Sequence, residues 1–140
     1  RSMVESLISR YSLVGNVSVV GYRSDIYSKM HHSDFLVVPS LYEGMPNVLL
    51  EALAIGLPCI VSDINIHKEI TEDGFCSLLF DPHSPNELAA KIDFALSAVA
   101  SLENLASLGF EIAQSYTPRK MAENYRCLYQ SILDGDSQAN

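Results

Sequence analysis

Short apolar runs alternate with helix-like segments along this chain, and the alternation is the feature that most constrains its fold. The apolar runs cover residues 17–20, 35–38, 59–61 and 78–80. Helix-like segments lie around residues 2–13, 25–32, 46–55, 66–70 and 85–98, and two more follow over 102–115 and 118–133. Buried parallel strands form continuous apolar runs, and crossover helices join them. The pattern therefore predicts an α/β fold in which a Rossmann-like parallel sheet is flanked by helices.

The size of the chain sets a second limit. With 140 residues, of which 48% are hydrophobic, it is long enough for one domain with a real core. We expect this domain over residues 1–133, followed by a flexible polar tail over 134–140. The cysteines lack metal-ligand spacing and are expected to be reduced thiols; they are Cys59, Cys76 and Cys127.

Charge and hydropathy exclude several classes of protein. The formal net charge of −8 argues against a nucleic-acid-binding surface. No apolar run approaches the ~18 residues of a membrane span, and no signal-peptide pattern is present, so we expect a cytoplasmic protein. No metal site is expected, because the adjacent His31 and His32 diverge by about 100° on a helix. The acidic triplet that begins at Asp134 has no strand before it.

A single charged residue, Glu51, interrupts the very apolar helix predicted over residues 46–55. Burying a carboxylate without a partner costs roughly several kcal/mol, so we expect Glu51 to face a ligand or a basic partner. It lies four residues beyond Asn47, which is about one helical turn or ~6 Å. This is roughly the step from the phosphates of a nucleotide to its ribose, whose hydroxyls an acidic residue binds in dinucleotide folds.

The turn before this helix predicts an anion site. Pro46 suits the first helical position, and the amides of Gly44, Met45 and Asn47 are then candidates to point outward without intrahelical partners. Such a helix terminus attracts phosphate. Glu43 lies on the preceding loop, at the carboxyl end of a strand, where ligands of open α/β sheets bind. It is a candidate to hold the hydroxyls of a sugar.

These residues also have structural interpretations. Glu43 would then cap the helix, and Glu51 would pair with a neighbouring cation. Ser40 either caps the turn or touches the sugar, and capping is the favoured role. Arg23 either approaches the base or phosphate of a nucleotide or stays solvated in an exposed loop.

The ordered series of motifs resembles the C-terminal, donor-binding half of a two-domain, GT-B-type glycosyltransferase of the large retaining group called family 4, or glycosyl transferases group 1. The resemblance runs from about Val17 to Tyr129. Its motifs are VSVVGY at 17–22, SDFLVVPS at 33–40, the stretch 43–54 from EG to EALA, GLPCIV at 56–61, EITEDG at 69–74 and LLF at 78–80. Glu43 and Glu51, with seven residues between them, form the signature of that family. Pro46 stands where many members have Gly, a difference that bears on which sugar is accepted.

The resemblance implies a role for each residue of the signature region. Glu43 would contact the donor sugar, and residues 44–47 would meet the donor diphosphate through backbone amides. Glu51 would bind the ribose. The chain around Gly21 and Tyr22 would lie against the base.

The resemblance also implies an activity for the full-length enzyme. It would transfer a sugar, with retention at the sugar carbon and without a metal or cofactor, from a nucleotide diphosphate-sugar to a glycan or lipid-linked acceptor. The acceptor would be held by an N-terminal domain that this chain lacks, so the chain alone is expected to be inactive. The implied setting is surface polysaccharide or glycoconjugate biosynthesis at the inner membrane face. A sugar-nucleotide epimerase of the same architecture and a non-catalytic nucleotide-binding or interaction domain are the alternatives.

Two strands that begin this half in the family are expected to be missing here. In the usual sheet order they lie between the strands predicted at 17–20 and 35–38. The chain should then leave a gap, rearrange the sheet or borrow a strand, and self-association is expected. The basic residues that meet the diphosphate belong to the same earlier segment in the family. No Lys or Arg occurs here between Lys29 and Lys68, so phosphate charge would be poorly neutralised.

Overall fold

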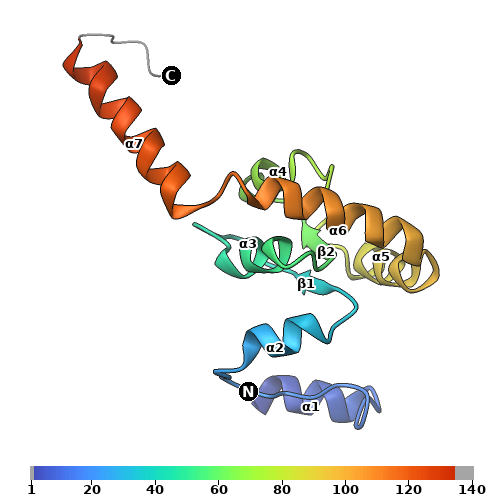
Figure 1. Cartoon of the computed structure of the whole chain (residues 1–140). Coiled ribbons are helices and arrows are strands. Elements are labelled where there is room, and N and C mark those ends of the chain that lie inside the picture. Colours follow the sequence, from blue (N-terminus) through green and yellow to red (C-terminus); the bar gives the residue numbers. More distant parts are fainter. Residues whose placement is uncertain (1, 135–140) are drawn as a thin grey trace.

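The computed structural model describes residues 2–134, in which helices surround a small sheet (Figure 1). The helices are α1 (Ser2–Arg10), α2 (Ile26–His31), α3 (Asn47–Ala54), α4 (Asn65–Thr71), α5 (Pro85–Ser97), α6 (Val99–Ala113) and α7 (Pro118–Leu133). The strands are β1 (Leu36–Val38), β2 (Cys59–Ser62) and β3 (Leu78–Phe80). The predicted tail over 134–140 lies outside the described residues except for Asp134.

All three strands run parallel, in the order β1-β2-β3. Val37 lies opposite Ile60 across the first pair, and Val61 lies opposite Leu79 across the second. All four residues of β2 are buried, as the continuous apolar run predicts for a central parallel strand. The expected α/β architecture with a parallel sheet and flanking helices is confirmed.

The strand predicted over residues 17–20 does not form, and that prediction is wrong. The segment is irregular, and the side chains of Val17 and Val20 are 44% and 62% exposed. Apolar character alone does not make a strand, because the backbone amides and carbonyls of a strand need a neighbouring strand to bond. Within the described residues, β1 pairs with β2 and nothing pairs with 17–20.

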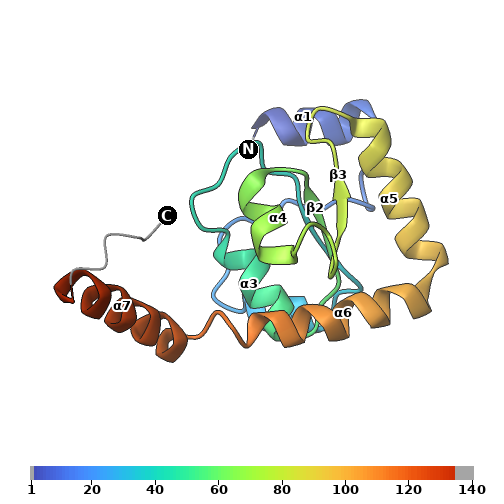
Figure 2. The ribbon, with the colours of Figure 1, turned by 90° about the horizontal axis from the view of Figure 1, so that it is seen from above.

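Alternate residues of β2 pack into two clusters on opposite faces of the sheet. Cys59 and Val61 belong to a core shared with α3, α4 and the end of α6. Ile60 joins Ala95 of α5 and Leu102 of α6 in the second cluster. Figure 2 shows α3 and α4 on one side of the strands and α5 on the other, with α6 running past the end of the sheet. The loop before α3 leaves the end of β1 and so lies at the carboxyl edge of the strands.

Close packing of α6 on α3 depends on a glycine. A Cβ atom at Gly109 would come within 2.6 Å of Leu53 Cδ2, well inside van der Waals contact. Leu53 is only 1% exposed, so its methyl group has little room to move. Gly109 therefore sets how near α6 approaches the helix that carries Glu51.

Helix α7 stands apart from this core (Figures 1 and 2). None of its residues is buried, although it begins with a Thr117 cap that accepts a hydrogen bond from the Lys120 amide at 3.2 Å. Its exposed apolar side chains include Met121, Tyr125, Leu128 and Ile132. Within the described residues, no helix combines the length and apolar character needed to cross a bilayer.

Candidate functional site

Glu43 is held by a hydrogen bond on the loop that leaves β1. The loop runs over residues 39–46, past the carboxyl end of the strand, where ligands of parallel α/β sheets bind. Ser40 Oγ donates to Glu43 Oε1 at 2.8 Å. Both side chains are half-buried. The side chain of Ser40 therefore bonds the carboxylate of Glu43. The second carboxylate oxygen of Glu43, Oε2, accepts no hydrogen bond from the described residues.

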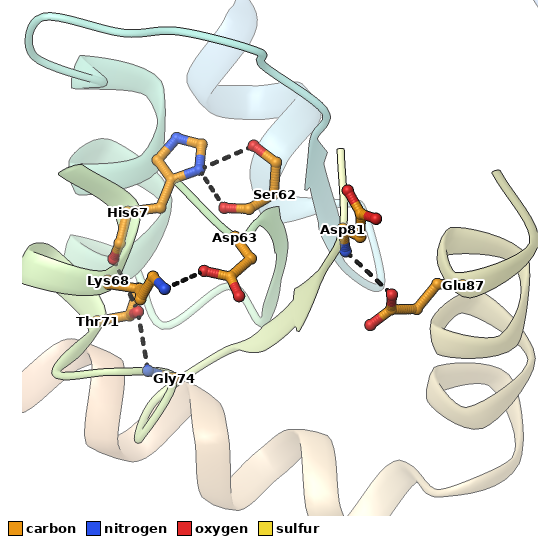
Figure 3. Close-up of polar contacts among 8 residues, drawn as sticks. All are labelled: Ser62, Asp63, His67, Lys68, Thr71, Gly74, Asp81 and Glu87. Carbon is orange, nitrogen blue, oxygen red and sulfur yellow. Dashed lines mark hydrogen bonds and ion pairs between the residues drawn. The ribbon is translucent and has the colours of Figure 1, made fainter. Parts of the chain in front are cut away.

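Two residues that sequence reasoning missed lie beneath this loop. Ser62, the last residue of β2, donates through Oγ to the carbonyl oxygen of Ser40 at 2.5 Å. His67 of α4 places Nδ1 2.9 Å from the Ser62 carbonyl oxygen and 3.2 Å from Ser62 Oγ (Figure 3). Ser62 and His67 are both fully buried. The only sequence signal was a polar residue closing an apolar run with a histidine five positions later, a pattern too common to be informative.

The start of α3 differs from the prediction by one residue. Pro46 is the residue before the helix, with φ −80° and ψ 76°, and Asn47 is the first helical position. The Asn47 amide, expected to be free, donates to the Met45 carbonyl oxygen at 2.9 Å. Within the described chain, the amides of Gly44, Met45 and Val48 make no hydrogen bond. Of the three amides expected to lack an intrahelical partner, those of Gly44 and Met45 are therefore unbonded, and the Val48 amide is unbonded as well.

Glu51 lies on α3, half-buried, and its partner is a phenol. Tyr27 of α2 donates through its hydroxyl to Glu51 Oε1 at 2.9 Å. This hydrogen bond and the charge of the carboxylate raise the pKa of Tyr27 above its usual value. In the described chain no Lys, Arg or His forms an ion pair with Glu51, so the cation predicted by the structural interpretation is not there.

The segment expected near the base of a nucleotide precedes α2. Gly21 adopts a positive φ of 66°, and Tyr22 is 97% exposed. Arg23 forms a bidentate pair with Asp25, with Nε donating to Oδ1 at 2.6 Å and Nη2 to Oδ2 at 2.5 Å. The pair raises the pKa of Arg23 and lowers that of Asp25, with the hydrogen bond as the first cause in both. Asp25, in the same loop, thus neutralises the positive charge of Arg23.

A broad groove of about 710 Å³ lies beside the start of α3. Met45, Asn47 and Leu50 form one wall, and the end of α6 and the first half of α7 form the other. Neither Glu43 nor Glu51 lines it. Its surface is mainly apolar, which suits packing more than an anionic nucleotide, so the two carboxylates and the free amides define the candidate site better than this groove does.

Metal binding finds no support in residues 2–134. No group of three or more His, Cys, Asp and Glu side chains is arranged there to hold a metal ion. The acidic triplet that begins at Asp134 falls largely outside the described residues.

Comparison with known proteins places the chain in a family. The model of "Glycosyl transferases group 1" matches residues 1–109. The putative glycosyltransferase EpsF of Bacillus subtilis is 45% identical over 117 residues, which cover 80% of this chain and 30% of that protein. The Escherichia coli UDP-Gal:alpha-D-GlcNAc-diphosphoundecaprenol alpha-1,3-galactosyltransferase is 44% identical over 63 residues, which cover 45% and 16% of the two chains.

A solved structure agrees with the sequence comparison. The structure of HepE from Anabaena in complex with UDP superposes with a TM-score of 0.80 at 25% identity, covering 90% of this chain and 36% of that one. The chain therefore spans well under half the length of each of these proteins.

Proposed function

Because this chain belongs to the family of glycosyl transferases group 1, we propose that it is the donor-binding part of a retaining, metal-independent glycosyltransferase of family 4. Its fold is that of the C-terminal half of a GT-B enzyme. The complete enzyme would move a sugar from a nucleotide diphosphate-sugar to an acceptor held by another domain. The chain alone, whose residues 1–133 would form the donor-binding domain, would bind the donor without transferring its sugar.

The observation that carries the proposal is the order of two carboxylates and three free amides along the chain. Glu43, held by Ser40, precedes the free amides of Gly44 and Met45, and Glu51 follows the free Val48 amide along α3. Carboxylates suit neutral hydroxyl donors, whereas free amides at a helix start suit an anion. A ligand with a sugar, then a diphosphate, then a ribose matches that order of groups.

Each group would act on a different part of the donor. Glu43 would orient the sugar and Glu51 the ribose hydroxyls. The free amides of Gly44, Met45 and Val48 would stabilise the charge that builds on the leaving diphosphate, and Pro46 and Asn47 would shape the turn that presents them. Gly21, Tyr22 and Arg23 would lie toward the base.

Two of the similar proteins support a uridine nucleotide as donor. The Escherichia coli relative carries UDP-Gal in its name, and the HepE structure contains UDP. The donor we propose is accordingly a UDP-sugar. The donor diphosphate would need further positive charge from the rest of the longer protein, because Lys68 is engaged with Asp63 at 2.6 Å and Arg23 with Asp25.

The acceptor we propose is a polyprenyl diphosphate-linked sugar, in surface polysaccharide or glycoconjugate assembly. The name of the Escherichia coli relative, which includes a diphosphoundecaprenol, supports this choice. An acceptor of this kind is embedded in a bilayer, so the complete protein would work on the cytoplasmic side, peripherally at the inner membrane face.

Amide NMR on the chain tests the donor site. Addition of UDP should shift the signals of Gly44, Met45 and Val48, and GDP and ADP should shift them less. Glu51→Ala should abolish these shifts. Glu103→Ala removes the same charge from an exposed position on α6 and should leave them unchanged. Absence of UDP binding both by this chain and by a longer form that includes the preceding segment of the protein would overturn the proposal.

A further inference from the structure

A buried hydrogen-bond network supports the Glu43 loop from below. The Ser62 carbonyl can only accept, so the proton of His67 lies on Nδ1 and points at Ser62. Ser62 Oγ then accepts from the same N–H and uses its own proton to donate to the Ser40 carbonyl oxygen. The Ser40 side chain in turn donates to Glu43. The network thus has a defined direction, from α4 through the end of β2 to the carboxylate.

Little else holds this loop in place. The side chains of Leu41, Tyr42 and Met45 are 65%, 86% and 55% exposed. In the described chain, no backbone amide over residues 40–46 donates a hydrogen bond to another backbone group. Beyond the buried ring of Pro46, the bond from Ser62 to Ser40 is therefore the main anchor of the turn that presents Glu43.

The histidine at the far end of the network is itself costly to bury. His67 Nε2 is inaccessible to solvent and has no hydrogen-bond partner within the described residues. In Figure 3 this nitrogen lies on the side of the ring turned away from Ser62. An apolar side chain would avoid the unpaired nitrogen, but it would have no donor to hold Ser62. Thr71 also binds the His67 carbonyl oxygen at 2.8 Å, which fixes the turn of α4 that carries the imidazole.

We propose that Ser62 and His67 are positioning residues that hold Glu43 in place for the donor sugar. The inference rests on the proposed function, in which Glu43 meets the sugar and Glu51 the ribose. Neither side chain bonds the free amides of Gly44, Met45 or Val48, and both would act on Glu43 through Ser40. Loss of the network should therefore weaken binding of the sugar part of the donor and spare the nucleotide part.

Comparing UDP with UDP-galactose as probes separates these effects. Ser62→Ala should weaken UDP-galactose binding by about fivefold, the scale of one hydrogen bond, and change UDP binding by less than about twofold. Ser77→Ala is the matched control, because Ser77 is also buried but its hydroxyl has no partner in the described chain. It should leave both affinities unchanged. His67→Asn, which keeps an N–H near Nδ1, should lie between wild type and His67→Leu.

Should Ser62→Ala fail to fold, Ser62→Cys provides the same comparison with a nearly isosteric, weaker donor. Equal weakening of UDP and UDP-galactose, or no change in either, overturns the positioning role while leaving the donor site intact. Failure of the wild-type chain and of its longer form to bind UDP at all overturns the proposed function and this inference with it.

Discussion

The hydroxyl of Tyr27 donates to Oε1 of Glu51 at 2.9 Å and so joins α2 to α3 across 24 residues of sequence. A carboxylate has acceptor sites for several donors, so this bond still leaves Oε2 open to a ribose. The phenol fixes the orientation of the carboxylate, and α2 is thereby part of the candidate nucleotide site.

Tyr27→Phe should weaken UDP binding by about two- to fivefold, because Glu51 would lose the bond that orients it. Isothermal titration calorimetry measures this change. Tyr11→Phe, at another exposed tyrosine, is the control and should bind as wild type does. Tighter binding by Tyr27→Phe would contradict the prediction, since it would mean that the phenol competes with the ribose.

The same bond predicts a loss of stability in alkali. The folded-state pKa of Tyr27 is raised by Glu51, so its contribution to stability is full below the unfolded pKa of about 10 and is lost as pH rises through the folded value. Urea unfolding between pH 9 and 11 should show a steeper loss for wild type than for Tyr27→Phe. Parallel curves for the two proteins would exclude this contribution.

The three cysteines should react with thiol reagents at very different rates. Burial raises the pKa of Cys59 to about 12 and that of Cys76 to about 11, so both are neutral thiols at pH 8, whereas Cys127 is exposed. Alkylation followed by mass spectrometry should label one thiol quickly, and Cys127→Ser should remove that label. Rapid labelling of a second thiol in the folded chain would contradict this prediction.

Gly109→Ala should destabilise the domain by about 1 kcal/mol. The clash with Leu53 costs about 1–3 kcal/mol, and the better helix propensity of alanine returns about 1 kcal/mol of that. In a Leu53→Ala background the clash is absent, so the same substitution should become neutral or stabilising. Urea unfolding of the four proteins in this cycle checks the coupling. Equal costs in both backgrounds would mean that the two residues do not interact.

The exposed apolar side of α7 should make the isolated chain self-associate. The sequence also predicts self-association, for a different reason, namely an incomplete sheet. Multi-angle light scattering should give a mass above the 15.4 kDa of one chain, rising with concentration. Replacing Leu128 and Ile132 together by glutamate should restore a monomer, and Ser131→Glu in the same helix should not. A wild-type chain that stays monomeric at every concentration would contradict the prediction.

Much of the fold was predictable because its information is local. Three of the four predicted strands form, and all seven predicted helices form with bounds shifted by a few residues. Apolar runs and helical periodicity report burial, which a short window of sequence determines. Residues 17–20 are the exception, because strand formation also depends on what lies alongside.

The residues of the candidate site were also visible, but their partners were not. The spacing of Glu43 and Glu51, and the turn between them, follow from neighbouring residues. The bonds from Tyr27 to Glu51 and from Arg23 to Asp25 depend on side-chain geometry that no pattern encodes. The bond from the Asn47 amide to the Met45 carbonyl oxygen depends on the backbone path of the turn.

The sequence by itself determined the layered parallel sheet, the helix that carries Glu51 and the candidate chemistry of the loop before it. Tertiary structure alone decided which groups meet: Ser62 under Ser40, His67 under Ser62, and Gly109 against Leu53. The physical reason is that hydrogen-bond partners are selected within about 3 Å, whereas sequence patterns specify which face of an element is buried and not what lies opposite it.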